Sequence, residues 1–289
     1  MKKKILIPTD FSKNAWNAIT YAADLFKDQE CTFYILNAFT TPGYTLGDMM
    51  VPEPGSASYD KAQISSENSL EKVMDMLKFR EQNDKHTYTT IAQYNSLLEA
   101  MKSFIEKRDI DLVVMGTKGA SNSRSAAFGS NTITAMEKLR NCPIIGVPLD
   151  ARVAHLKEIV FPTSYKTHYK RRELQYLVDL AQLQAANICI VHVDGHDGHD
   201  GHDDLSKDQK ENKQLLEECL EGASYSFHHL GGSDATESVQ RFVESRDSDM
   251  IAFINKKHAF FWSVFSTSMV KELGMFSKVP LLVLHDWRN

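Results

Sequence analysis

The segment Lys4-Ile5-Leu6-Ile7-Pro8-Thr9-Asp10 joins a short apolar run to a polar turn, and its Ile7-Pro8-Thr9-Asp10 part recurs as Phe161-Pro162-Thr163-Ser164. Two further pairs of similar segments follow in the same order, namely 104–111 with 242–249 and 142–145 with 279–282. Three matches in one order indicate a duplicated domain. We therefore expect one domain over 1–150 and a second copy over 151–289.

The two copies differ in length. The separation between matching positions falls from 154 to 138 residues after the first match, so the first copy carries extra residues. We place them at 40–62, a stretch dense in Pro, Gly and other turn formers. A loop of this length without secondary structure is either simply mobile or functional. The second copy carries a different insert at 194–204.

Each copy alternates short apolar runs with amphipathic helical patterns. Such alternation predicts a parallel sheet with helices on both faces. In the first copy Ser12 is expected to cap a helix, Ser96 and Glu99 to form a capping box, and 65–80 and 131–139 to be helical. Strands are expected at 4–8, 32–39, 87–92, 111–115 and 144–147, and in the second copy at 158–162, 187–193, 224–229, 249–254 and 281–284. The fold class is therefore α/β, with two tandem open parallel-sheet domains of about five strands each.

Composition and charge narrow the class of protein. Of the 289 residues, 42% are hydrophobic and 25% are charged, which is typical of a globular protein, and the net charge is −5. This charge gives no general attraction to nucleic acid or to anionic membranes. The longest apolar run is too short to span a membrane. The four cysteines are scattered, which favours a reducing cytoplasm.

A glycine-rich loop follows the fourth strand of the first copy. Met115-Gly116-Thr117-Lys118-Gly119 ends that strand, and Gly129-Ser130-Asn131-Thr132 opens the next helix. Glycines let backbone N–H groups approach an anion closely, and a helix N-terminus favours negative charge. Lys118 and Arg124 could offset phosphate charge. The alternative is that the glycines only end a strand and mark a turn, but their place at the ligand-binding edge of a parallel sheet favours a phosphate cradle.

The spacing Gly116-x2-Gly119-x9-Gly129-Ser130 resembles the nucleotide-binding signature of the universal stress protein family, as does the opening Ile5-Leu6-Ile7-Pro8-Thr9-Asp10-Phe11-Ser12. The resemblance covers both copies and implies a Rossmann-like domain of the adenine nucleotide alpha hydrolase-like type. It also implies an ATP site, with Mg²⁺ on the phosphates, in which Asp10 faces the ribose or adenine and the backbone at Ala38 meets the adenine. Asn37 stands where many members have His. The residues implied in binding are Pro8, Thr9, Asp10, Ala38, Met115, Gly116, Thr117, Gly119, Gly129, Ser130, Asn131 and Thr132.

The second copy departs from this signature. Phe253-Ile254-Asn255-Lys256-Lys257-His258 stands where the first copy has its glycines, and Ser164 replaces Asp10. The residues at 260–262, where the loop would be, are bulky, and their side chains should block the close approach of a backbone to a phosphate. We therefore expect one nucleotide per chain, bound by the first copy. The second copy would have a structural or partner-binding role. The resemblance also implies that the last strands, 144–147 and 281–284, pair within the chain as a pseudo-dimer, and a homodimer is a further option.

A low-complexity tract, 194–204, contains His196, His199 and His202 among Asp and Gly residues. His and Asp are ligands for Zn²⁺ or Ni²⁺, so the tract is a candidate metal site. The alternative, a polar flexible loop, would bind metal only weakly because ordering it costs entropy. His228 and His229 are expected on a strand face.

Three functions are compatible with these patterns. The first is a cytoplasmic stress-response protein that binds ATP or a related adenine nucleotide and changes its contacts with a protein partner. The second is a slow ATPase or nucleotidyl-transfer enzyme, for which the sequence offers no general base near the phosphates. The third is a metal-binding module built on the His/Asp tract. No catalytic residue is expected.

Overall fold

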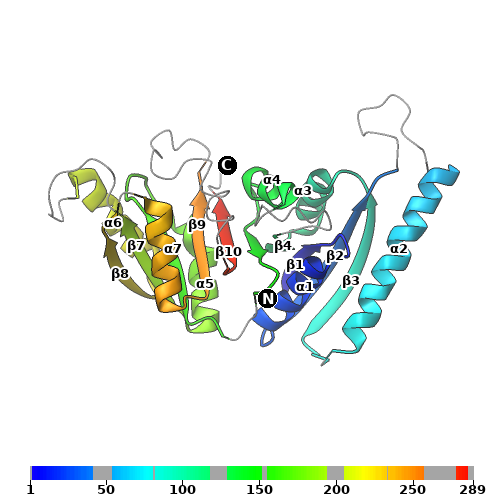
Figure 1. Ribbon diagram of the computed structural model, residues 1–289, viewed down its shortest axis with the longest axis horizontal. Coiled ribbons are helices and arrows are strands. Elements are labelled where there is room, and N and C mark those ends of the chain that lie inside the picture. Colours follow the sequence, from blue (N-terminus) through cyan, green and yellow to red (C-terminus); the bar gives the residue numbers. More distant parts are fainter. Residues whose placement is uncertain are drawn as a thin grey trace. The chain divides into compact units, whose positions relative to one another are not determined.

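The computed structural model describes residues 2–41, 54–80, 82–117, 129–151, 155–193, 205–232, 234–256 and 278–285. The chain divides into two compact units that part between Asp150 and Ala151. Both units are α/β, with parallel strands and helices on the sheet faces (Figure 1). The expected fold class is confirmed.

The first unit has five strands in the order β3-β2-β1-β4-β5, and every described pair is parallel. The order reverses beside β1, which makes the carboxyl ends of β1 and β4 the topological switch point. The strands are β1 (Lys3–Pro8), β2 (Cys31–Phe39), β3 (His86–Tyr94), β4 (Leu112–Gly116) and β5 (Ile144–Val147). The helices are α1 (Lys13–Leu25), α2 (Ala57–Lys78), α3 (Leu97–Arg108) and α4 (Ser130–Lys138).

Helices α2 and α3 cover opposite faces of the first sheet. On β2, Asn37 accepts a hydrogen bond from Ser66 of α2, whereas the ring of Tyr34 packs edge-on against Phe104 of α3. Odd and even residues of a strand point to opposite faces, so these contacts place the two helices on different sides. The core between them is apolar, and the side chains of Ile5, Leu6 and Ile7 on β1 are fully buried.

The second unit repeats the arrangement, with the strand order β10-β9-β6-β7-β8 and parallel pairs. Its strands are β6 (Glu158–Thr163), β7 (Asn187–Val193), β8 (Ser224–Leu230), β9 (Met250–Asn255) and β10 (Leu281–His285). Its described helices are α5 (Arg171–Gln184), α6 (Lys207–Cys219) and α7 (Ala235–Arg246). His228 and His229 lie on β8, as expected.

Two local expectations need correction. Helix α2 begins at Ala57, so part of the stretch expected to be loop at 40–62 is helical, and residues 42–53 lie outside the described chain. At α3 only half of the expected capping box forms: Ser96 Oγ accepts from the Glu99 N–H at 3.4 Å. The backbone N–H of Ser96 instead donates to Asn95 Oδ1, and the Glu99 carboxylate pairs with Lys102. Asn95 therefore takes the donor that the box would have used.

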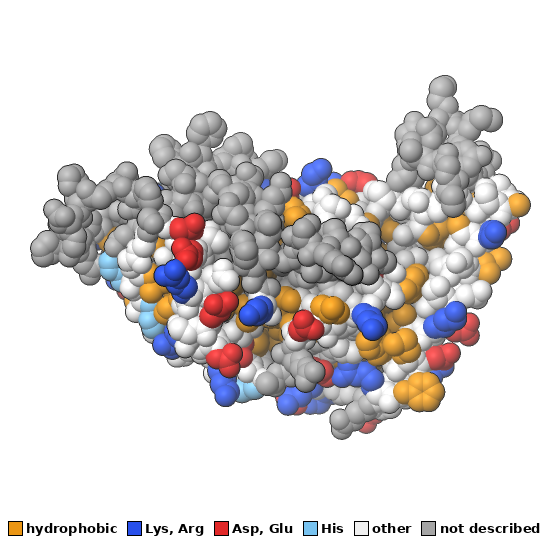
Figure 2. All heavy atoms as spheres, in the orientation of Figure 1, with side chains coloured by type: hydrophobic (Ala, Val, Ile, Leu, Met, Phe, Trp, Pro, Cys, Tyr) orange, Lys and Arg blue, Asp and Glu red, His pale blue; other side chains and the backbone are white. Residues whose placement is uncertain are grey.

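Charged side chains of both signs are interspersed on the face of the molecule in Figure 2, consistent with the small net charge. Within the described ranges, no helix is both long enough and apolar enough to cross a membrane.

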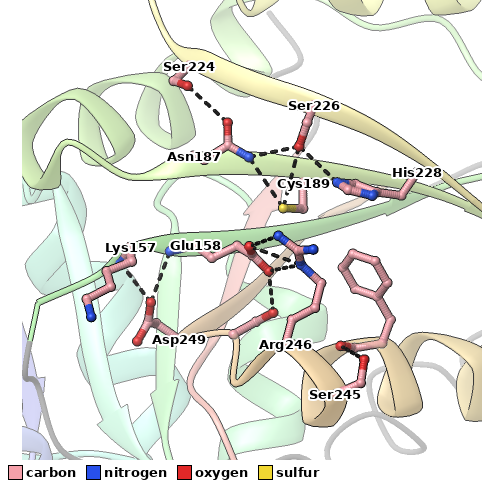
Figure 3. A network of polar contacts seen from close by, with 12 residues as sticks. Lys157, Glu158, Asn187, Cys189, Ser224, Ser226, His228, Ser245, Arg246 and Asp249 are labelled. Atoms are coloured by element: carbon pink, nitrogen blue, oxygen red, sulfur yellow. Dashed lines mark hydrogen bonds and ion pairs between the residues drawn. The ribbon is translucent and has the colours of Figure 1, made fainter.

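A polar network ties together the amino ends of β6, β7 and β8 and the end of α7 (Figure 3). The Glu158 carboxylate accepts from Arg246 Nη2 at 2.6 Å and from Ser248 Oγ at 2.7 Å, while Asp249 accepts the backbone N–H of Glu158 at 3.0 Å. Arg246 lowers the pKa of Glu158 to about 2, against the opposing effect of burial. The carboxylate therefore stays ionised in the folded protein down to strongly acidic pH.

Replacing Glu158 by Gln is expected to lower the free energy of unfolding by about 2 kcal/mol at pH 7, after allowance for solvent screening at the half-exposed Arg246. The folded pKa lies below the unfolded value, so this stabilisation is present above about pH 4.5 and is lost as the pH falls toward about 2. Urea unfolding at pH 7 and pH 3 measures both effects. The matched control is Glu237→Gln, which removes an exposed pair with Arg241 and should leave stability unchanged. Equal losses in the two variants would contradict the assignment.

Candidate functional site

The switch point of the first unit holds a pocket with a volume of about 170 Å³. It lies at the carboxyl ends of β1, β2 and β4 and at the beginnings of α1, α3 and α4. Residues that are far apart in the sequence meet here. Those expected at the site that line it are Pro8, Thr9, Asp10, Ala38, Met115, Gly116, Gly129, Ser130, Asn131 and Thr132.

Some expected residues are placed elsewhere or are not described. Thr117 is buried next to the pocket, where its backbone N–H donates to Val147 and its carbonyl accepts from Gly129. Gly119, Lys118 and Arg124 lie outside the described residues. So does the tract with His196, His199 and His202, and no cluster of three or more metal-binding side chains occurs among the residues that the structure describes.

Three lining residues were not among the expected binding residues: Ala15 on α1, Asn37 on β2 and Leu97 on α3. Asn37 could have been included from its position alone, because it precedes Ala38 at the end of the same strand. Ala15 and Leu97 read in the sequence as apolar helix positions. Nothing in the sequence distinguishes them from ordinary core residues.

A tight turn after β1 positions Asp10 at the mouth of the pocket. Thr9 Oγ1 accepts the Phe11 N–H at 3.0 Å, and Phe11 takes a positive φ of 64°. The Asp10 carboxylate is exposed and accepts the Ser12 N–H at 3.1 Å. Ser12 then caps α1 by accepting from the Ala15 N–H. The turn therefore presents an oriented carboxylate, an acceptor suited to hydroxyl groups.

Gly116 is required by the packing of α1 on β4. A Cβ placed on it would lie 2.8 Å from the backbone oxygen of Asn14, closer than real Cβ contacts allow. The carbonyl of Gly116 accepts from Thr132 Oγ1 at 2.9 Å, which fixes the start of α4 against the end of β4. The glycine thus lets α1 start directly after the turn, and α4 is held against the same strand.

Helix α4 points its amino end at the pocket. Its N-cap is Gly129, which offers no side chain to the helix, and the first N–H groups of any helix lack intrahelical partners. These N–H groups and the helix dipole make the terminus of α4 favourable for an anion. Ser130 and Asn131 supply exposed polar side chains at the same place.

The second unit keeps the turn. Thr163 Oγ1 accepts the Tyr165 N–H at 3.0 Å, with Tyr165 at a φ of 54°. His192 Nδ1 donates to the Thr163 carbonyl at 2.9 Å, as the Asn37 amide does to Thr9 at 2.8 Å. The duplicated segments therefore share their backbone geometry, not only their sequence.

The space beyond that turn is filled in the second unit. Ile254 stands where β4 has Gly116, and α5 begins at Arg171, later after its strand than α1 does after β1. Tyr169, just before α5, is buried and hydrogen-bonds to Thr163. Lys256 Nζ pairs with Glu173 Oε2 at 3.2 Å, and their side chains are 15% and 2% exposed. Residues 260–262, which we expected to fill this edge of the second unit, lie outside the described residues. Among the described residues, Tyr169, Glu173 and Lys256 fill it.

Residues 1–147 match the model of the universal stress protein family. A universal stress protein from Archaeoglobus fulgidus is similar in structure, with a TM-score of 0.69, 16% identity and 97% of each chain covered. A functionally unknown protein from Pseudomonas aeruginosa has a TM-score of 0.55 at 11% identity and covers 98% of this chain and 92% of its own. The cytoplasmic domain of a prokaryotic cation chloride cotransporter has a TM-score of 0.52 at 10% identity, covering 99% and 96%. At these identities the likeness shows the fold alone. No curated protein matches the chain in sequence.

Replacing Gly116 by Ala is expected to destabilise the protein by about 1–3 kcal/mol, because the new methyl group would meet the backbone of Asn14. The matched control is Gly231→Ala, since nothing lies within 4 Å of a Cβ at Gly231. Urea unfolding of the two variants measures the difference. If Gly116→Ala were as stable as the control, the close approach of α1 would not be a constraint.

Removing the Lys256 ammonium by Lys256→Met is expected to cost about 3 kcal/mol, because it leaves the Glu173 carboxylate buried without its counter-charge. Adding Glu173→Leu to that variant should recover most of the loss. Thermal unfolding of both single variants and the double variant gives the coupling energy. Additive losses would show that the two side chains do not act as a pair.

Proposed function

Because the chain belongs to the universal stress protein family, we propose that its first unit binds ATP or a related adenine nucleotide and that it acts as a nucleotide-dependent stress-response protein. The observation that carries the proposal is the pocket at the switch point, where an oriented carboxylate and the amino end of a helix meet. Nucleotides bind at this place in open parallel sheets.

The polar groups of the pocket suit the parts of a nucleotide. Asp10 would accept hydrogen bonds from ribose hydroxyls, as acidic residues do in other nucleotide-binding sheets. The backbone at Ala38 would meet the base, and the N–H groups of Ser130 and Asn131 at the start of α4 would bind phosphates. Mg²⁺ would be held through the phosphates. A net charge of −5 does not attract such an anion, so its affinity would come from this local backbone geometry.

Binding is favoured over hydrolysis. Asp10 is the ionisable residue in the described lining, and its carboxylate already accepts the Ser12 N–H. A hydrolase needs a base beside the attacking water. We therefore propose that the protein acts as a switch, which changes its contacts with a protein partner when nucleotide binds. It would not act as a rapid enzyme.

One nucleotide would bind per chain. In the second unit, Tyr169 and the Lys256–Glu173 pair fill the place that is open in the first unit. The second unit would then serve as a structural or partner-binding copy. Pairing of the last strands, and association into a homodimer, are compatible with this role and remain proposals.

Calorimetric titration with ATP tests the proposal. The native chain is expected to bind one ATP per chain, and Asn131→Asp should weaken binding by about tenfold, because it adds a negative charge where phosphates would lie. The same charge favours the start of a helix, so the variant should fold normally. The control Thr236→Asp places an equal charge in the first turn of α7. Absence of ATP binding, or equal affinity for Asn131→Asp and the native chain, would reject the site.

A further inference from the structure

Asn37 is a polar side chain buried in the lining of the pocket, with 9% of its surface exposed. Its amide Nδ2 donates to the Thr9 carbonyl at 2.8 Å. Its Oδ1 accepts from the hydroxyl of Ser66, on α2, at 2.7 Å. The amide is therefore held between the turn after β1 and helix α2.

These two bonds fix which way the amide faces. A carbonyl oxygen only accepts, so Nδ2 must be the atom that faces Thr9. An amide has two N–H donors and two lone pairs on its oxygen. The bonds to Thr9 and Ser66 use one of each. One donor and one acceptor of the amide are therefore left for a ligand.

The second unit shows that the turn does not itself need an amide. His192 occupies the equivalent position and makes the same bond to the carbonyl of Thr163. An imidazole whose Nδ1–H is used in this way has a single ring nitrogen left, which cannot offer a donor and an acceptor together. His would also support this turn. Asn at position 37 therefore adds something that His does not offer, a hydrogen-bond donor together with an acceptor.

We propose that Asn37 determines the base specificity of the pocket by pairing with the N6 and N7 edge of adenine. This rests on the function proposed above. Adenine presents a donor at N6 beside an acceptor at N7, and an Asn amide matches both. Guanine presents acceptors at O6 and N7, so the Asn37 oxygen would face an acceptor. Ser66 is a positioning residue, since it holds the amide oxygen.

The test compares ATP, GTP and 7-deaza-ATP, which has C–H in place of N7, by calorimetric titration. The native chain is expected to bind ATP at least about tenfold more tightly than either analogue, the discrimination typical of such a pair. Asn37→His, at pH 8 where the imidazole is neutral, should bind ATP and 7-deaza-ATP equally, because it offers nothing to N7. Ser66→Ala should reduce the discrimination while retaining nucleotide binding.

The control Asn95→His changes an amide that accepts the Ser96 N–H before α3 and does not line the pocket, and it should keep the native discrimination. Thermal unfolding verifies that each variant folds, and His192 indicates that His is tolerated at this position. A native chain that binds ATP and 7-deaza-ATP equally, or an Asn37→His variant that still distinguishes them, would overturn the role of Asn37 while leaving the nucleotide site in place. A native chain that binds none of the three would overturn both proposals.

Discussion

The close approach of α1 to β4 is the constraint on which the pocket depends. It is possible because residue 116 has no side chain: its backbone lies where a Cβ would touch the oxygen of Asn14. Helix α1 can then start directly after the turn that carries Asp10. In the second unit Ile254 brings a side chain to the same place, and α5 starts later. The unit with Gly116 at this position thus has an open edge at the end of its sheet, and the unit with Ile254 has a filled one.

This changes the physical meaning of the glycine signature. From sequence, Gly116 reads as a residue that lets the backbone approach a phosphate. In the structure its first constraint is internal, the packing of a helix on a strand. The N-cap Gly129 fits the original interpretation better, because it opens α4 toward the pocket without a capping side chain. If a substitution of Gly116 abolished binding, the cause could be either disturbed packing of α1 or a lost phosphate contact. A substitution of Asn131 tests the phosphate contact alone.

The strands were predictable from sequence to within a residue or two at their ends. For the central strands the reason is that parallel strands buried on both faces are continuous apolar runs. The start of α2 was not predictable, since residues 57–62 lack a strong apolar pattern and follow a turn-rich stretch. The site was predictable where residues follow strands, as at Asp10 and Gly116. The residues that fill the second unit were not, because Lys256 follows β9 and is far along the chain from Tyr169 and Glu173 at the start of α5. Their contact depends on how far α5 lies from its strand, which only the fold determines.

The filled edge of the second unit also bears on how the protein would respond to ligand concentration. Cooperativity within a chain requires two coupled sites for the same ligand. With one nucleotide per chain, as proposed, there is no second site to couple, so the saturation curve would be a simple hyperbola, half complete at the dissociation constant. A steeper, threshold-like response would have to arise between chains. The Lys256–Glu173 pair would thus make each chain a graded sensor of nucleotide level.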